Sequence, residues 1–137
     1  MVVQIGKDKH INIRKEIFDE ICLSIKQHHY ETGGIIGVDT NGVITAFQLD
    51  EICNPNLYEY HPNIDFLNEV INIKWEKSGI KFIGFVHSHL HNDVLSQQDI
   101  IYAKTILMEN SFLDNIILGI LNLDNKNNMI KWHCISI

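Results

Sequence analysis

Four side chains in this sequence have the types and the spacing that metal-assisted hydrolysis needs. His87 and His89 lie two residues apart, and Asp99 follows ten residues later. Imidazole nitrogens and carboxylate oxygens are common zinc ligands, and three protein ligands leave a fourth position open for water. Glu31 lies far upstream, just before Gly33-Gly34, and is a candidate general base. These residues predict a catalytic zinc centre and therefore a metallohydrolase.

The two histidines follow a nearly continuous apolar segment, residues 80–86, which is typical of a strand covered on both faces. Side chains two apart in a strand project from the same face, so both imidazoles can reach one point. The alternative is that both are polar residues at a strand end, satisfied by backbone partners. An apolar strand that ends in His-x-His favours the metal-ligand interpretation.

Ser96 and Asp99 allow two interpretations. Ser-x-x-Asp before a helix resembles a capping box, in which Ser96 caps the helix and Asp99 lies in its first turn. A first-turn carboxylate can also point out of the helix toward a metal, so the two functions can coexist. Glu31 alone is a weak indication. The glycines after it allow close backbone approach, so the acid could lie against the sheet edge that bears the histidines.

The rest of the sequence predicts the elements that would position these residues. Asn12 is expected to cap the first helix, and Asn63 or Asp65 to open the second. The order strand, helix, hairpin, helix, strand, helix, hairpin favours one α/β domain over residues 1–137, with a mixed central sheet flanked by helices. Strands are expected over 2–5, 35–38, 43–49, 80–86, 115–123 and 129–137, helices over 12–29, 63–79 and 96–109, and a loop over 53–61.

Composition excludes several classes of protein. The chain has 137 residues, of which 45% are hydrophobic, so it can form one sizeable core. The net charge of −6 and the scattered Lys and Arg residues disfavour a nucleic-acid partner. Cys22, Cys53 and Cys134 form no Cys-x-x-Cys pair, which favours reduced thiols and a cytoplasmic location. Neither a signal peptide nor an apolar run long enough for a membrane span is expected.

Together, the motifs resemble a known family. Glu-Thr-Gly-Gly-Ile-Ile-Gly from Glu31, His-Ser-His from His87 and Ser-x-x-Asp from Ser96 are similar to the JAMM motif of the JAB/MPN+ zinc metalloproteases, and the resemblance covers essentially the whole chain. It implies a bacterial-type, stand-alone JAB domain with a mixed, mostly antiparallel sheet flanked by helices, layered as in cytidine deaminases. It implies one zinc ion per chain on His87, His89 and Asp99. Glu31 would then be the general acid/base, and Ser96 would help to hold the water or the tetrahedral intermediate.

The segment between the second histidine and Ser96 departs from the family pattern. Leu90 stands where the family usually has proline, and the segment from His89 to Ser96 is one residue shorter than usual. His91 and Asp93 lie in the same segment and could supply an extra polar contact or ligand. A solvated loop is the favoured interpretation of these two residues.

The resemblance also implies a substrate class. Family members hydrolyse peptide or isopeptide bonds at the C-terminal tails of ubiquitin-like or sulfur-carrier proteins, sometimes beside activating and conjugating enzymes. Short loops near 53–61 and 108–115 favour a minimal cleft for an extended Gly-Gly tail, bound as an added strand along an exposed sheet edge. Bulky side chains in the tail are expected to clash beside Gly33-Gly34 and the 89–96 loop. Two alternatives stay open: a catalytically silent MPN-type scaffold, which the intact ligand set disfavours, and a zinc hydrolase that acts on a small non-protein amide.

Overall fold

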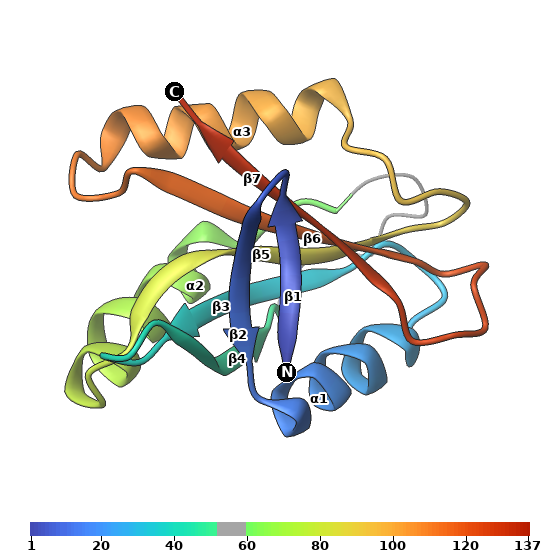
Figure 1. Ribbon diagram of the computed structural model, residues 1–137, viewed down its shortest axis with the longest axis horizontal. Coiled ribbons are helices and arrows are strands. Elements are labelled where there is room, and N and C mark those ends of the chain that lie inside the picture. The colour runs from blue at the N-terminus through green and yellow to red at the C-terminus, as the bar shows by residue number, and fades with distance from the viewer. Residues whose placement is uncertain (52–59) are drawn as a thin grey trace.

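The computed structural model describes residues 1–51 and 60–137, which form a twisted seven-stranded sheet in the order β1-β2-β4-β3-β5-β6-β7 (Figure 1). The strands are β1 (Val2–Gly6), β2 (Lys9–Ile13), β3 (Gly33–Val38), β4 (Val43–Leu49), β5 (Lys81–His89), β6 (Asn115–Asn122) and β7 (Ile130–Ser136). The helices are α1 (Lys15–Lys26), α2 (Ile64–Glu69), which continues as the π-helix η1 (Val70–Trp75), and α3 (Gln97–Glu109).

The sheet is mixed, as the sequence predicts. Strand β2 pairs with β4 in parallel, and so does β5 with β6, whereas the other four pairs of neighbours are antiparallel. The mixed and mostly antiparallel character is therefore confirmed. The likeness of its layering to that of cytidine deaminases stays a prediction.

Helices cover both faces of the sheet. One core lies between α1 and the sheet and includes Phe18, Ile21 and Ile25. The core on the other face includes Trp75 of η1 and Leu107 of α3. Figure 1 shows α1 and α3 on opposite sides of the sheet. Within the described residues, no helix is both long enough and apolar enough to cross a lipid bilayer.

The predicted start of the first helix is wrong. Asn12 does not cap it but lies in β2, where it pairs with Val2 of β1 and Val43 of β4. The helix begins after Arg14, which has extended backbone dihedrals and makes no side-chain cap. Ile13 lies on the same four-residue repeat as Ile17, Ile21 and Ile25, a spacing that favours a helix. In the structure Ile13 is fully buried at the end of a strand, because hairpin pairing with β1 and contact with β4 outweigh the local helical spacing.

Other boundaries differ less. The hairpin of β3 and β4 is confirmed, and its turn is held by Asp39 Oδ1, which accepts hydrogen bonds from two backbone N–H groups. Gly33-Gly34 was expected to precede the strand but belongs to β3, and β5 extends beyond residue 86 through His89. The helices and strands after residue 95 begin and end within about two residues of the predicted positions.

One of the two residues predicted to open the second helix, Asn63 or Asp65, caps it. Asn63 Oδ1 accepts a hydrogen bond from Phe66 N at 3.1 Å, so Asn63 and not Asp65 opens the helix. Ile64, Leu67 and Trp75 have the spacing of one α-helical face, yet Ile64 is 45% exposed whereas Leu67 and Trp75 are buried. The π-helix has a longer repeat than an α-helix, so α-helical spacing does not preserve one face along this segment. The predicted loop over 53–61 lies mostly outside the described residues.

Candidate metal centre

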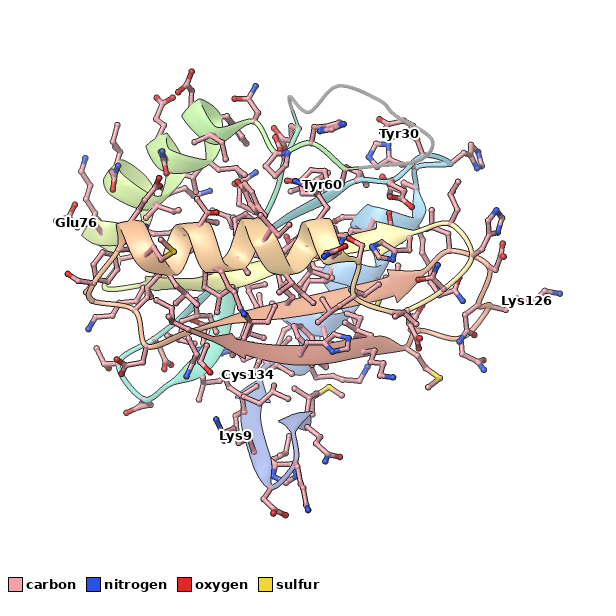
Figure 2. All side chains as sticks on the ribbon, turned by 90° about the horizontal axis from the view of Figure 1, so that it is seen from above. Lys9, Tyr30, Tyr60, Glu76, Lys126 and Cys134 are labelled. Atoms are coloured by element: carbon pink, nitrogen blue, oxygen red, sulfur yellow. The ribbon has the colours of Figure 1, made fainter. Side chains whose placement is uncertain are left out.

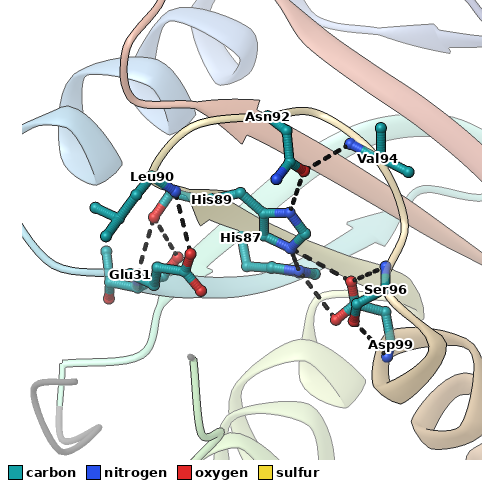
Figure 3. A network of polar contacts seen from close by, with 10 residues as sticks. Glu31, His87, His89, Leu90, Asn92, Val94, Ser96 and Asp99 are labelled. Carbon is teal, nitrogen blue, oxygen red and sulfur yellow. Dashed lines mark hydrogen bonds and ion pairs between the residues drawn. The ribbon is translucent and has the colours of Figure 1, made fainter. Parts of the chain in front are cut away.

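The two histidines lie in β5, between β3 and β6, and their rings converge. His87 and His89 are 5% and 9% exposed, and their Nε2 atoms lie 3.1 Å apart (Figure 3). Both side chains leave the same face of the strand, as their two-residue spacing requires. The expectation that both imidazoles reach one point is met by the geometry.

Asp99 completes the cluster from the first turn of α3. Its Oδ1 lies 3.2 Å from His87 Nε2, and its Oδ2 lies 3.3 Å from His89 Nε2. The three residues each offer one ligand atom, and these atoms lie within 4.8 Å of one another, so the cluster could hold a metal ion. Around a tetrahedral zinc ion with bonds of about 2.0–2.1 Å, ligand atoms lie about 3.3–3.4 Å apart. The distances in the cluster fit that geometry.

Ser96 is the N-cap of α3. Asp99 N donates to Ser96 Oγ, and Ser96 N donates to Asp99 Oδ2, each at 3.0 Å, which is a complete capping box. The capping interpretation is therefore confirmed. The same carboxylate also faces both histidines, so the capping contact leaves it available to the cluster that could hold a metal ion. The proposed contact of Ser96 with a reaction intermediate stays a prediction.

Electrostatics within the cluster favour a cation. Burial alone would raise the pKa of Asp99, but hydrogen bonds with His87 and His89 outweigh burial and hold that pKa well below its usual range. Burial alone would lower the pKa of His89, but hydrogen bonds with Asp99 and Asn92 outweigh it, so this pKa is raised. Protons and metal ions therefore compete for the same position, and metal affinity should weaken as the pH falls.

Glu31 lies beside this cluster although it is far away in the sequence. Its side chain is 8% exposed, and its Oε2 accepts a hydrogen bond from Leu90 N at 3.1 Å. Burial raises the pKa of Glu31, while the Leu90 N–H and the two histidines partly offset the rise. A buried carboxylate with a raised pKa, beside a cluster that could hold a metal ion, has the character of a general acid or base.

Gly33 explains how Glu31 comes so near. Gly33 pairs with His87 across β3 and β5, and a Cβ atom on Gly33 would lie 2.4 Å from Val86 O and 2.6 Å from His87 Cβ. Only glycine allows the two strands to pack this closely. The expected close backbone approach is thus observed, inside the sheet rather than at its edge. Gly33 and Gly34 face neighbouring strands, so they give no reason for a preference for small substrate residues.

A cavity of about 770 Å³ opens onto the cluster and Glu31. One wall is Tyr60, whose ring lies over His87 at a centroid distance of 6.0 Å, on the face of the sheet that α2 and α3 cover (Figure 2). Tyr60 OH donates to Asp50 Oδ2 at 2.9 Å, and Asn63 N donates to the same oxygen at 2.7 Å. Asp50, only 2% exposed, thus anchors the segment that borders the centre.

The sequence did not identify Asp50, Tyr60 or Asn92 as residues of the site. The favoured interpretation of His91 and Asp93 as residues of a solvated loop agrees with the structure. His91 Nδ1 lies 2.7 Å from Asp124 Oδ2 in an exposed hydrogen bond, and His91 is not in the cluster that could hold a metal ion. Asp93 is exposed, which agrees with a solvated loop. No local pattern in the sequence marks Asp50 or Asn92, because their contacts depend on how the strands and loops pack.

Leu90 offers a test of how Glu31 is held. Proline in its place, as in the family that the motifs resemble, has no N–H to donate, and the extended conformation of His89 is compatible with a following proline. In a chain that hydrolyses its substrate through Glu31, Leu90→Pro should lower the rate about tenfold to a hundredfold, since a hydrogen bond to a charged group contributes about 1.5–3 kcal/mol.

The loss of this hydrogen bond should also change the pH dependence of the rate. The lost hydrogen bond favoured the ionised carboxylate, so the pKa of Glu31 should rise further and the acid limb of the pH–rate profile should move to higher pH. Leu90→Ala keeps the N–H and should leave this limb in place. Equal shifts of the acid limb in both variants would show that the side chain, and not the N–H, matters.

Comparison with known proteins supports the fold and leaves activity open. No family model and no curated protein matches the chain. The solution structure of protein DSY2949 from Desulfitobacterium hafniense is similar, with a TM-score of 0.67 and 17% identity over 90% of this chain and 80% of that chain. The crystal structure of AF2198, a JAB1/MPN domain protein from Archaeoglobus fulgidus, matches with a TM-score of 0.49 and 16% identity over 92% and 87%. The first similarity shows a shared fold, and the second is too weak to carry an argument.

Proposed function

We propose that this chain is a zinc-dependent hydrolase of the JAMM type, with an MPN/JAB-like fold. Its substrate would be a peptide or isopeptide bond at the C-terminal tail of a ubiquitin-like or sulfur-carrier protein. The observation that carries the proposal is the convergence of His87, His89 and Asp99 at the spacing of zinc ligands, beside a buried carboxylate in one cavity. A silent scaffold would need neither the ligand set nor the buried Glu31.

The donor set fits zinc better than a hard cation. Two imidazole nitrogens and one carboxylate oxygen match catalytic zinc sites, whereas magnesium and calcium prefer oxygen ligands alone. When bound, zinc would lower the pKa of a water molecule to about 7 and polarise a substrate carbonyl. His87 and His89 would ligate through Nε2, and Asp99 through a carboxylate oxygen.

The protein's own groups would supply the proton transfers. Glu31 takes a proton from the attacking water and returns it to the leaving amine, a role for which its raised pKa prepares it. The Leu90 N–H holds the carboxylate in place during both steps. Tyr60 and the loop before α3 border the cavity and would exclude bulk water around the reacting bond. Ser96, also at the cavity, would donate to the developing oxyanion.

The substrate class is tested with fusion proteins and metal removal. A ubiquitin-like protein joined through Gly-Gly to a reporter should be cleaved after the second glycine by the zinc-loaded chain. Treatment with a chelator should abolish cleavage, and added zinc should restore it. The same fusion with the glycines changed to leucine should be cleaved far more slowly, because the cavity is bordered by Tyr60 and the 90–96 loop.

Two outcomes would contradict parts of this proposal. Equal cleavage of both fusions would remove the tail preference. Zinc-dependent hydrolysis of small acyl amides without cleavage of either fusion would favour the small-amide alternative. Activating and conjugating enzymes as partners, and a cytoplasmic location, belong to the same proposal.

A further inference from the structure

Asn92 contacts a metal-ligand candidate from the loop between β5 and α3. Its Oδ1 lies 3.1 Å from His89 Nδ1, on the side of the ring away from the cluster (Figure 3). The same oxygen accepts a hydrogen bond from the backbone N–H of Val94 at 3.0 Å. One side-chain atom therefore joins the local turn of the loop to the histidine ring.

The second contact fixes the identity of this atom. The side-chain oxygen and nitrogen of asparagine are assigned from their hydrogen bonds, and a backbone N–H can only donate. The atom shared by Val94 and His89 must therefore be the carbonyl oxygen of Asn92. Since a carbonyl oxygen only accepts, His89 Nδ1 must donate, and it carries a proton. A neutral imidazole protonated on Nδ1 has its lone pair on Nε2.

That lone pair points into the cluster. His89 Nε2 faces Asp99 Oδ2 at 3.3 Å and His87 Nε2 at 3.1 Å. A lone pair set against a carboxylate oxygen is repulsive unless a cation lies between them. For the neutral tautomer that Asn92 selects, a metal ion between the two groups removes this repulsion.

We propose that Asn92 is a positioning residue, which holds His89 in the Nδ1-protonated tautomer and so presents Nε2 to the metal. This inference rests on the proposed metal centre and adds a residue to it. In metal sites generally, mutation of a residue that orients a ligating histidine in this way typically lowers metal affinity or activity about 10–100-fold. The Val94 N–H bond prevents the Asn92 amide from turning over, so the orientation is fixed by the loop itself.

Zinc affinity, measured by competition with a chromophoric chelator, tests this inference. Asn92→Ala should weaken zinc binding about 10–100-fold. Asn92→Asp keeps an oxygen that accepts from both donors and should retain most of the affinity. Asn125→Ala is the matched control: Asn125 Oδ1 accepts from Asn127 N at 2.9 Å in the same kind of turn, and its side-chain amide contacts Met129 instead of a histidine. This control should bind zinc as the unmodified chain does.

Three results would overturn the inference: unchanged affinity in Asn92→Ala, an equal loss in Asn125→Ala, or an Asn92→Asp variant as weak as Asn92→Ala. If the unmodified chain binds no zinc, the proposed function fails instead. A second measurement then still tests the hydrogen bond between Asn92 and His89. Nitrogen-15 spectra of the histidines in metal-free protein, at a pH where they are neutral, should show His89 protonated at Nδ1, and Asn92→Ala should mix the two tautomers. A His89 protonated at Nε2 in the unmodified chain would refute the role of Asn92.

Discussion

Glu31→Gln should retain one zinc ion per chain and lose hydrolysis by about two to four orders of magnitude, the usual contribution of a general base. Glutamine keeps the size of the side chain and can still accept the Leu90 N–H, but its amide cannot take a proton from water. Removal of a buried carboxylate whose pKa is raised should not destabilise the fold. Zinc stoichiometry by elemental analysis and turnover of the Gly-Gly fusion measure the two effects.

Variants of the candidate metal ligands should lose zinc, in contrast to Glu31→Gln. Asp99→Asn keeps an oxygen for the Ser96 N–H, so the helix cap survives, and His87→Ala removes one imidazole from the cluster. Both should lose zinc and activity together while circular dichroism stays that of the folded chain. His91→Ala, in the adjacent loop, should keep its zinc. If Glu31→Gln lost zinc and Asp99→Asn kept it, the assigned roles of base and ligand would have to be exchanged.

Gly33→Ala should destabilise the protein strongly and disturb the centre at the same time. The added Cβ would lie 2.4 Å from Val86 O, and because this oxygen belongs to the backbone of β5, the strand itself must move. Overpacking of a core typically costs about 1–3 kcal/mol, and contact with backbone puts this variant at the upper end. Any shift of β5 moves His87, so zinc affinity should fall together with the urea midpoint.

Gly6→Ala is the control for that variant. A Cβ atom on Gly6 would lie 4.0 Å from its nearest neighbour, Lys9 Cβ, so the urea midpoint should change little. A Gly33→Ala variant with the stability and zinc affinity of the unmodified chain would mean that β3 and β5 can separate without cost. The close packing of Gly33 on His87 would then not be what positions the centre.

The sequence by itself determined those features of the centre that depend on short-range geometry. Two histidines two apart in an apolar strand had to share a face, and Ser-x-x-Asp had to form a helix start. Both follow from backbone repeats and from hydrogen bonds between residues at most three apart, and the structure contains both. The existence of helix α1, though not its start, and that of the β3–β4 hairpin were predictable for the same reason.

Tertiary structure decided everything that depends on which strands and loops become neighbours. Glu31 reaches the histidines because Gly33 pairs with His87. Tyr60 borders the cavity beside His87, and its hydroxyl donates to Asp50, which follows β4. Asn92 orients His89 only once the loop has folded. The same cause misled the prediction at Asn12, where strand pairing outweighed helical spacing. The pattern of residues along the sequence indicates local periodicity. Which distant segments pair depends on the close packing of the whole core, and no short stretch of sequence carries that information.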